Sequence, residues 1–388
     1  MKKIQIVLAV LLFAAVLACG GGDNAVILSR PVLVGALLNG DPQGDPDTQA
    51  AVRLAADDVN QYLAGVGSKL RIELQVEAAG LNPDRAVQGL SRLQQAGAAI
   101  VVGPESSLEL QALLSMAAGG RTVLISHCST ASSLAVADGV FRLVPSDLSQ
   151  TRVIAGRMAA SGAARAVLVY RDDVFGRDLT ASLRPELVSR GITILGALAY
   201  DVNTTQFTPL VTQLNDLVQA NPGCVVQLSA FGPDATALFE SAASFSGLAA
   251  VRWFGSDGTA KSLQILNSPA AARFALDTAF ESPLFGVPET EKTRAVSARV
   301  GAASGVAEPQ VCSLTAYDAV WLAAMTMLAA SDGGYTALKT MLPITAYSYC
   351  GASGRTKLNS AGDRVGGVYD IWVESGNTWV VGARVVDP

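Results

Sequence analysis

Most of this chain alternates short apolar runs of strand length with longer stretches in which apolar residues recur at helical spacing. No other feature of the sequence restricts the possible folds as strongly. Thr122–Ser126 is a run of the first kind, and Thr48–Leu63 is a stretch of the second kind. Repeated strand–helix succession favours parallel sheets with covering helices. The succession starts again after Pro145, with a helix expected over Gln150–Ala160, so we predict two consecutive α/β units of typical domain size.

The pattern becomes less regular beyond Gly258, in the C-terminal third of the chain. We expect one strand, two helices and a final hairpin there, over Leu276–Glu281, Thr290–Ala303, Leu314–Ala330, and the paired runs Gly367–Glu374 and Thr378–Val386. Hydrophobic residues make up 50% of the chain and charged residues 16%, which is ample for a large core. The length also favours two domains.

The N-terminus has the layout of a bacterial export signal. Lys2 and Lys3 precede an apolar run, Ile4–Ala18, that is too short to cross a membrane comfortably. Val16-Leu17-Ala18-Cys19 resembles a lipobox, in which the cysteine becomes the lipidated first residue. We therefore expect a signal peptide over residues 1–18, a lipidated tether over residues 19–30, and an exported protein anchored to the cell envelope. A plain secreted protein cleaved nearby is the alternative.

Four cysteines remain after Cys19, and an exported compartment permits disulfides between them. Cys312 and Cys350 both lie in the C-terminal third, each beside an expected helix, and we predict that these two form a disulfide. Cys224 opens an apolar strand and is expected as a buried thiol. For Cys128 both a free thiol and a bridge stay open.

Two polar loops follow neighbouring expected strands, where ligands bind in open α/β sheets. One is Gly103–Ser107 and the other is His127–Ser133. Together they suggest a cradle for an anion or a carboxylate, built from hydroxyls and backbone N–H groups. Ordinary helix N-caps are the alternative, because serine and threonine are favoured there. The candidate residues in these loops are Ser106, Ser107, Ser129 and Thr130.

Several classes of function find no support in the sequence. The formal net charge of −5 without a basic cluster argues against a nucleic-acid partner. A Ser-His-Asp triad would have to use His127, the single histidine, with Ser129 or Ser132 and Asp257. There is no Gly-x-Ser-x-Gly elbow, no zinc-type ligand spacing and no Gly-x-Gly-x-x-Gly after the first strand. We therefore expect no enzyme, no metal site and no cofactor.

Short segments spread over the chain share their order and spacing with one known family: they are Val34–Leu37, Asn82–Ala86, Val102–Pro104, Val169–Gly176, Tyr317–Val320 and Gly351–Gly354. With these segments the chain resembles the type I periplasmic binding proteins, most closely the branched-chain amino-acid (Leu/Ile/Val) group that feeds ABC transporters. The resemblance implies two Rossmann-like lobes with parallel-type sheets and three hinge crossovers, near Val144-Pro145, Ser282-Pro283 and Gly366-Gly367. Lobe one would comprise residues 31–144 plus 283–365, and lobe two residues 147–280 plus 366–388.

The resemblance also implies how an amino acid would be held between the lobes. Its carboxylate would be bound from lobe one, its ammonium would meet a carbonyl of lobe one and an acid of lobe two, and two aromatic residues would cover the cleft. The matching residues are Ser106 or Ser107 and Thr130, then Cys128 and Asp257, then Phe175 and Phe231. These roles agree with the chemistry, because a carboxylate accepts hydrogen bonds and an ammonium only donates them. A simple turn residue is the alternative for Asp257.

The chain departs from the family pattern in its first loop, where Gly44 stands at a common aromatic position and Asp41, Asp45 and Asp47 add charge. Side-chain specificity is therefore not carried over, and a ligand more polar than leucine fits the departure. We expect a solute-binding lipoprotein that captures an amino acid or related small polar metabolite for the permease of an ABC importer. A lipoprotein sensor on the same fold is the alternative, and a Ser/His hydrolase is less favoured.

Overall fold

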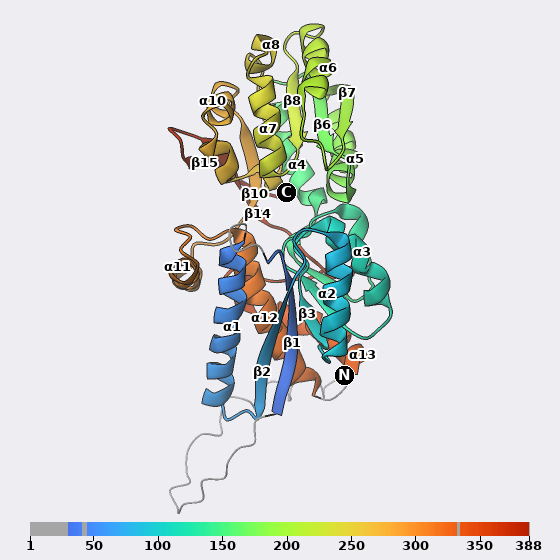
Figure 1. The fold of residues 1–388 in the computed structure, drawn as a ribbon, viewed down its shortest axis with the longest axis vertical. Coiled ribbons are helices and arrows are strands. Elements are labelled where there is room, and N and C mark those ends of the chain that lie inside the picture. Colours follow the sequence, from blue (N-terminus) through green and yellow to red (C-terminus); the bar gives the residue numbers. More distant parts are fainter. Residues whose placement is uncertain (1–29, 41–44, 332–333, 388) are drawn as a thin grey trace, which may run out of the picture.

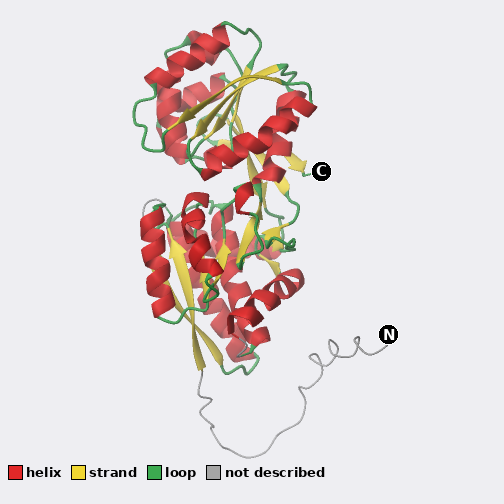
Figure 2. Ribbon diagram, turned by 90° about the vertical axis from the view of Figure 1, so that its right-hand side faces the viewer, coloured by secondary structure: helices red, strands yellow, loops and turns green. Residues whose placement is uncertain are grey.

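The computed structural model describes residues 30–40, 45–331 and 334–387, which form two α/β lobes stacked along the long axis of the molecule (Figure 1). The expected signal peptide, Cys19, the tether up to Ser29, Asp41 and Gly44 lie outside these residues. Figure 2 shows strands enclosed by helices in each lobe, which confirms the predicted two-lobe α/β fold.

Lobe one is built on a six-stranded sheet whose neighbouring strands all run parallel. Its order is β13-β5-β4-β3-β1-β2, with β1 (Arg30–Leu38), β2 (Leu70–Ala78), β3 (Ile100–Val102), β4 (Val123–Ser126), β5 (Val140–Pro145) and β13 (Asp363–Arg364). The helices of this lobe are α1 (Pro46–Gly65), α2 (Pro83–Gln95), α3 (Ser107–Ala118), α11 (Glu291–Ser304), α12 (Val311–Ala330) and α13 (Gly334–Ser348). A small hairpin joins β11 (Cys350–Gly351) and β12 (Gly354–Arg355).

Strand β1 shows why this sheet needs helices on both faces. Val34, Ala36 and Leu38 pack into the core shared with α1, α12 and α13. Leu37 packs into the opposite core with α2 and α3. Side chains alternate across a strand, so a strand with apolar residues on both faces, as β1 has from Val32 onward, must be covered on both sides.

Lobe two is built on a seven-stranded sheet of order β15-β14-β10-β9-β8-β6-β7. Its strands are β6 (Arg165–Arg171), β7 (Thr193–Tyr200), β8 (Val225–Ser229), β9 (Trp253–Phe254), β10 (Glu281–Gly286), β14 (Val368–Glu374) and β15 (Trp379–Val386). Its helices are α4 (Asp147–Ala160), α5 (Val174–Ser189), α6 (Thr208–Gln219), α7 (Gly232–Ala242), α8 (Ser246–Ala249), α9 (Leu263–Asn267) and α10 (Pro269–Asp277). The antiparallel pair β14–β15 confirms the predicted C-terminal hairpin.

Three segments connect the lobes: β5 leads into α4, β10 leads toward α11, and β13 leads into β14. Two expectations near the second connection are wrong. The strand expected over Leu276–Glu281 is the end of α10 and a turn, and the real strand is β10. Residues 283–286 pair with β14 and therefore belong to lobe two, so this crossover follows Gly286 rather than Ser282. Pro283 is tolerated because β9 pairs with β10 only at Glu281, which leaves one side of the strand without a neighbour at the proline.

Helix α12 is the central helix of lobe one. It is long and apolar enough to cross a membrane, but 78% of its apolar window is buried inside the protein, as in a core helix. Its buried Asp318 is fully satisfied, because the carboxylate accepts hydrogen bonds from Tyr349, Ala352 and Ser353. A buried carboxylate needs such partners, and Asp318 finds all of them within lobe one.

The predicted Cys312–Cys350 disulfide is wrong. Cys312 pairs with Cys128, with 5.4 Å between their Cα atoms, and Cys350 is free and exposed. Cys312 lies in the first turn of α12, whereas the neighbours of Cys350 contact Asp318, six residues or about 9 Å further along this helix. Cys224 is a buried free thiol, as expected.

Candidate functional site

The carboxyl ends of the lobe-one strands point toward lobe two (Figure 1). The lobes meet on one side through the short 3₁₀ helix η1 (Ser132–Leu134) and helix α5. There the backbone N–H of Ser133 donates to Asp178 Oδ2 at 2.7 Å, and the hydroxyls of Ser132 and Ser182 are 3.1 Å apart. The two polar loops singled out in the sequence therefore lie at the junction of the lobes.

The hydroxyls of these loops are largely engaged with one another. Ser107 Oγ lies 2.9 Å from Ser129 Oγ and accepts from the backbone N–H groups of Thr130 at 3.3 Å and Ala131 at 3.1 Å. The N–H of Ser129 donates to Ser126 Oγ at 3.2 Å. The structure thus brings Ser107, Ser129 and Thr130 together, and their hydrogen bonds connect the loop after β3 to the loop after β4.

Ser106 is a helix cap. Its hydroxyl accepts from the backbone N–H of Glu109 and donates to the Glu109 carboxylate at 2.8 Å, while that carboxylate accepts from the Ser106 N–H. This reciprocal arrangement is a capping box, in which two free N–H groups of a helix start are satisfied. The alternative reading of this loop as a helix N-cap therefore describes Ser106.

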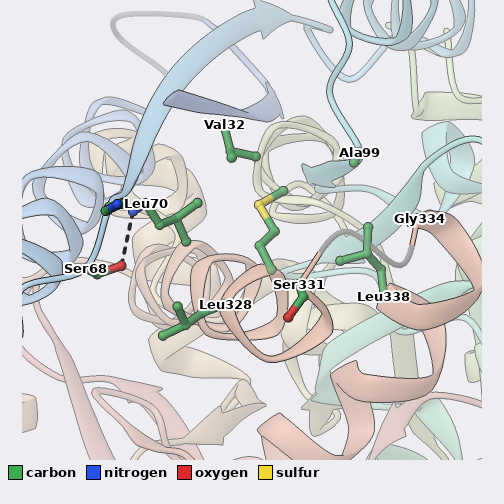
Figure 3. A pocket seen from close by; sticks show the side chains of 10 residues that line it. Val32, Ser68, Leu70, Ala99, Leu328, Ser331, Gly334 and Leu338 are labelled. Atoms are coloured by element: carbon green, nitrogen blue, oxygen red, sulfur yellow. Dashed lines mark hydrogen bonds between the residues drawn. The ribbon is translucent and has the colours of Figure 1, made fainter. Parts of the chain in front are cut away.

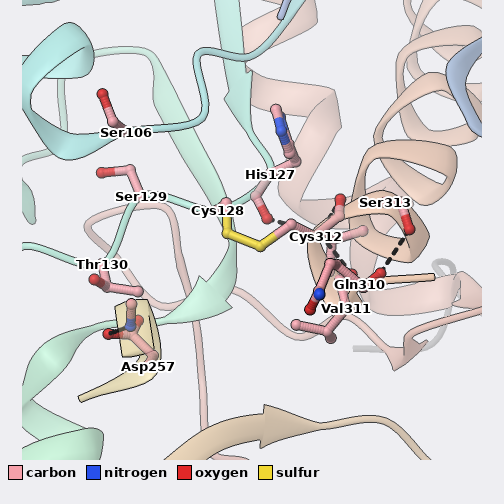
Figure 4. Close-up of a disulfide and its surroundings, with 12 residues drawn as sticks. Ser106, His127, Cys128, Ser129, Thr130, Asp257, Gln310, Val311, Cys312 and Ser313 are labelled. Carbon is pink, nitrogen blue, oxygen red and sulfur yellow. Dashed lines mark hydrogen bonds between the residues drawn. A yellow bond between two sulfur atoms is a disulfide. The ribbon is translucent and has the colours of Figure 1, made fainter. Parts of the chain in front are cut away.

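Asp257 opens the 3₁₀ helix η2 (Asp257–Thr259) at the carboxyl end of β9. Its backbone N–H donates to Gln150 Oε1 at 2.9 Å, and its Oδ1 accepts from the N–H of Gly258 at 2.9 Å. Burial raises the pKa of Asp257 to about 6, against the opposing effect of the hydrogen bond with Gln150. Figure 4 shows this side chain below Thr130, which belongs to lobe one.

Asp147, which the sequence reasoning did not select, completes an acidic pair with Asp257. Its N–H donates to the carbonyl of Thr130 at 2.8 Å, across the lobe junction, and its Oδ1 accepts from Gln150 Nε2 at 3.0 Å. The side chain is fully buried, and Oδ2 has no partner among the described residues. Burial, followed by the negative charge of Asp257, raises the pKa of Asp147 well above its ordinary value.

The structure brings Phe175 and Phe231 together. Their rings stack with 5.2 Å between centroids, and the guanidinium of Arg171 lies 4.3 Å from the centroid of the Phe231 ring. Phe231 also lies against the loop of Asp257, because a Cβ at Gly258 would come within 2.5 Å of the Phe231 ring. The aromatic pair therefore borders the acidic pair from lobe two.

A second acidic group lies at the carboxyl edge of lobe one. Asp45, immediately before α1, is 6% exposed, and its Oδ2 has no partner among the described residues. Burial is the main cause that raises its pKa to about 7. One carboxylate oxygen of Glu105, in the loop after β3, likewise has no partner in the part of the chain that the structure describes. Burial, followed by the charge of Asp45, raises the pKa of Glu105 well above its ordinary value. Asp47 differs, because its carboxylate accepts from the N–H of Gln310 at 2.7 Å.

His127 is a packing residue in the described structure. Its ring is fully buried and points away from the Cys128–Cys312 disulfide (Figure 4), and neither ring nitrogen has a partner among the described residues. Burial lowers its pKa to about 4, so the ring is neutral at physiological pH. The residue is held by its backbone carbonyl, which accepts from the Thr315 hydroxyl at 2.7 Å. The Ser-His-Asp triad weighed in the sequence is not assembled.

A cavity of about 510 Å³ opens at the other end of the lobe-one strands, away from the junction (Figure 3). Its lining is mainly apolar and includes Val32, Leu70, Ala99, Met327, Leu328 and Leu338. None of the predicted site residues contributes to it, so it is separate from the candidate site.

Two α/β lobes joined by three connections, with polar and acidic loops where the lobes meet, define a type I periplasmic-binding-protein fold. The sequence model of the receptor family ligand binding region matches residues 47–376, and the chain belongs to this family.

Known proteins of similar sequence or structure come from several different organisms. An uncharacterised protein of Methanocaldococcus jannaschii is 26% identical over 346 residues, which are 84% of this chain and 82% of that protein. Glutamate receptor 3.2 of Arabidopsis thaliana is 26% identical over 311 residues, 78% of this chain but only 34% of the receptor. The leucine binding protein LivK of Thermotoga maritima superposes with a TM-score of 0.80 at 14% identity, covering 92% of this chain and 99% of LivK.

Proposed function

We propose that this chain is an extracytoplasmic solute-binding protein that captures an amino acid or a related small amine between its lobes for an ABC importer. Membership of a ligand-binding family and the fold shared with LivK support a ligand-capturing role. The observation that carries the proposal is the pair Asp147 and Asp257 at the lobe junction, where a fully buried carboxylate oxygen has no described partner. An ammonium placed there supplies a positive charge and the missing donors. Asp318, in contrast, obtains its donors from within its own lobe.

In this proposal the ligand's ammonium lies against the two carboxylates, with the carbonyl of Cys128 on the lobe-one side. Lobe-one contacts come from the loops of Ser106, Ser107, Ser129 and Thr130, and Phe231 with Phe175 behind it excludes water from lobe two. Because the pair lies at the lobe junction, a ligand there contacts both lobes and favours their closed arrangement.

Thermal-shift screening against amino acids, amines and other small metabolites tests the proposal. A ligand that binds only the folded chain at one hundred times its Kd adds about 2.7 kcal/mol of stability, which is a clear rise in Tm. Small-angle scattering of the same mixtures is expected to show compaction. The proposal fails if no compound of the panel raises Tm or compacts the protein.

Anchoring through acylated Cys19 is the second part of the proposal, motivated by the lipobox-like Val16–Cys19 and the glycine-rich segment after it. Cys19→Ser is expected to move the protein from the membrane fraction to the soluble exported fraction, because the acyl chains provide the membrane affinity. Immunoblotting of fractionated cells measures the shift, with Cys350→Ser as the matched control. An unchanged fractionation of Cys19→Ser contradicts the anchor.

A sensor role is the second candidate, because the matched family is defined by receptor ligand-binding regions and a plant receptor is among the relatives. An importer is distinguished from a sensor by reconstituting the ligand-loaded protein with the permease and ATPase of an ABC importer from the same organism. Stimulated ATP hydrolysis supports import, and ligand binding without any such stimulation favours the sensor.

A further inference from the structure

The lobe-one loops offer few free donors to a ligand carboxylate. The N–H groups of Thr130 and Ala131 already donate to Ser107 Oγ, and the hydroxyl of Ser106 donates to Glu109. A carboxylate is an acceptor only, and it gains little where the donors are already satisfied.

The basic side chains of this region are also occupied. Arg142 donates to the carboxylate of Asp363 and to the carbonyl of Ala131 at 2.6 Å. Arg171 of lobe two donates to Asp173 and Asp234, each at 2.6 Å. Each guanidinium is therefore neutralised by a carboxylate and provides no free charge for an anionic group.

Acceptors, in contrast, are in excess on both sides of the junction. Lobe two contributes Asp257 and the fully buried Asp147 with its unpartnered oxygen. Lobe one contributes Glu105 and the buried Asp45. Each of these also has one carboxylate oxygen without a partner among the described residues. An unpartnered oxygen on a buried carboxylate is costly, and three of these four acids have one among the described residues, so acids on both lobes favour a ligand that is positive at both ends.

We propose that the site takes an alkyl diamine, with one ammonium between Asp147 and Asp257 and the other against Asp45 and Glu105. This inference rests on the proposed solute-binding function and names its substrate class. The raised pKa of each of these acids agrees with it, because a nearby cation stabilises the ionised form of every one of them. Stacked Phe175 and Phe231 provide an apolar wall beside the first ammonium.

Titration calorimetry with putrescine, cadaverine, n-butylamine, leucine and glutarate tests the inference. We expect at least one diamine to bind ten times more tightly than n-butylamine, which has the same chain as putrescine but one charge. Diamine affinity is expected to fall as the pH is lowered from 8 to 5, because the acids become protonated. Tighter binding of leucine than of either diamine overturns the inference and leaves the proposed function standing. Tighter binding of glutarate overturns both, because glutarate has no ammonium. If no compound binds in calorimetry and none raises Tm in the metabolite screen, the diamine inference and the proposed function are both wrong.

Isosteric variants test the lobe-one contact separately. Asp45→Asn with Glu105→Gln is expected to weaken the diamine at least tenfold and to leave n-butylamine within about threefold, because only the second ammonium uses these groups. Asp84→Asn, at an exposed position of α2, is the matched control on the same lobe. Circular dichroism melting confirms that each variant is folded. Equal loss for the diamine and the monoamine, or no loss for either, refutes the second ammonium site.

Discussion

Asp257→Ala is expected to weaken an amine ligand by about thirtyfold to several thousandfold, which corresponds to about 2–5 kcal/mol. In the variant the desolvated ammonium keeps the carboxylate of Asp147 but loses that of Asp257, so one of its two carboxylate partners is gone. Shielding by Phe231, which contacts the adjacent Gly258, makes the loss larger, because charge-assisted hydrogen bonds are stronger where water is excluded. Calorimetry with the ligand found by screening measures the change.

Two controls make this result specific. Asp216→Ala removes an exposed acid from α6 of the same lobe and is expected to bind within about twofold of the parent. Thr130→Ala is expected to cost less than Asp257→Ala, because backbone groups of that loop remain. Binding by Asp257→Ala within about threefold of the parent would show that Asp257 does not contact the ligand.

The pH dependence has a definite sign. The pKa of Asp257 is raised to about 6, so its carboxylate is ionised above that pH and becomes protonated below it. Alkylammonium groups stay charged up to about pH 10. Affinity for an amine is therefore expected to fall below about pH 6, and Asp147, whose pKa is also raised, adds to the same trend.

The sheet of each lobe could be predicted because its central strands, such as β4 and β8, are buried on both faces. The final hairpin was placed within one residue at each end, since the predicted runs Gly367–Glu374 and Thr378–Val386 are β14 and β15. Helix α13 was missed. Pro343 lies inside it and argues against a helix on sequence alone, but Leu338, Leu342 and Ala346 recur every four residues and pack on α12, and this burial decides the structure.

The candidate site was predicted in part for a related reason. Asp257 follows an apolar strand, so its position at the lobe junction could be inferred. Asp147 stands in the Pro145-Ser146-Asp147 helix start, where an acid is expected for helix stability alone. Only the folded chain shows that its carboxylate turns to Gln150 and shares the region of Asp257. Residues that act through long-range contact leave no local pattern in the sequence.

The Cys128–Cys312 disulfide illustrates the same limit, and it leads to a stability prediction. The two cysteines are 184 residues apart, so no spacing motif connects them, whereas the fold places the end of β4 against the first turn of α12. The chain-entropy relation gives about 5 kcal/mol of stabilisation for closing a loop of this length. Cys128→Ser, Cys312→Ser or reduction is therefore expected to lower the free energy of unfolding by an amount approaching this value.

Chemical denaturation of the oxidised and reduced protein measures the difference, and non-reducing peptide mapping identifies the bond. Cys350→Ser is the matched control, since Cys350 is a free, exposed thiol and its loss is expected to change stability by less than about 0.5 kcal/mol. The bond also fixes the loop that carries Thr130, whose carbonyl receives the N–H of Asp147, so its reduction is expected to weaken ligand binding as well. A peptide map that links Cys312 to Cys350, or equal stability with and without reductant, would contradict this assignment.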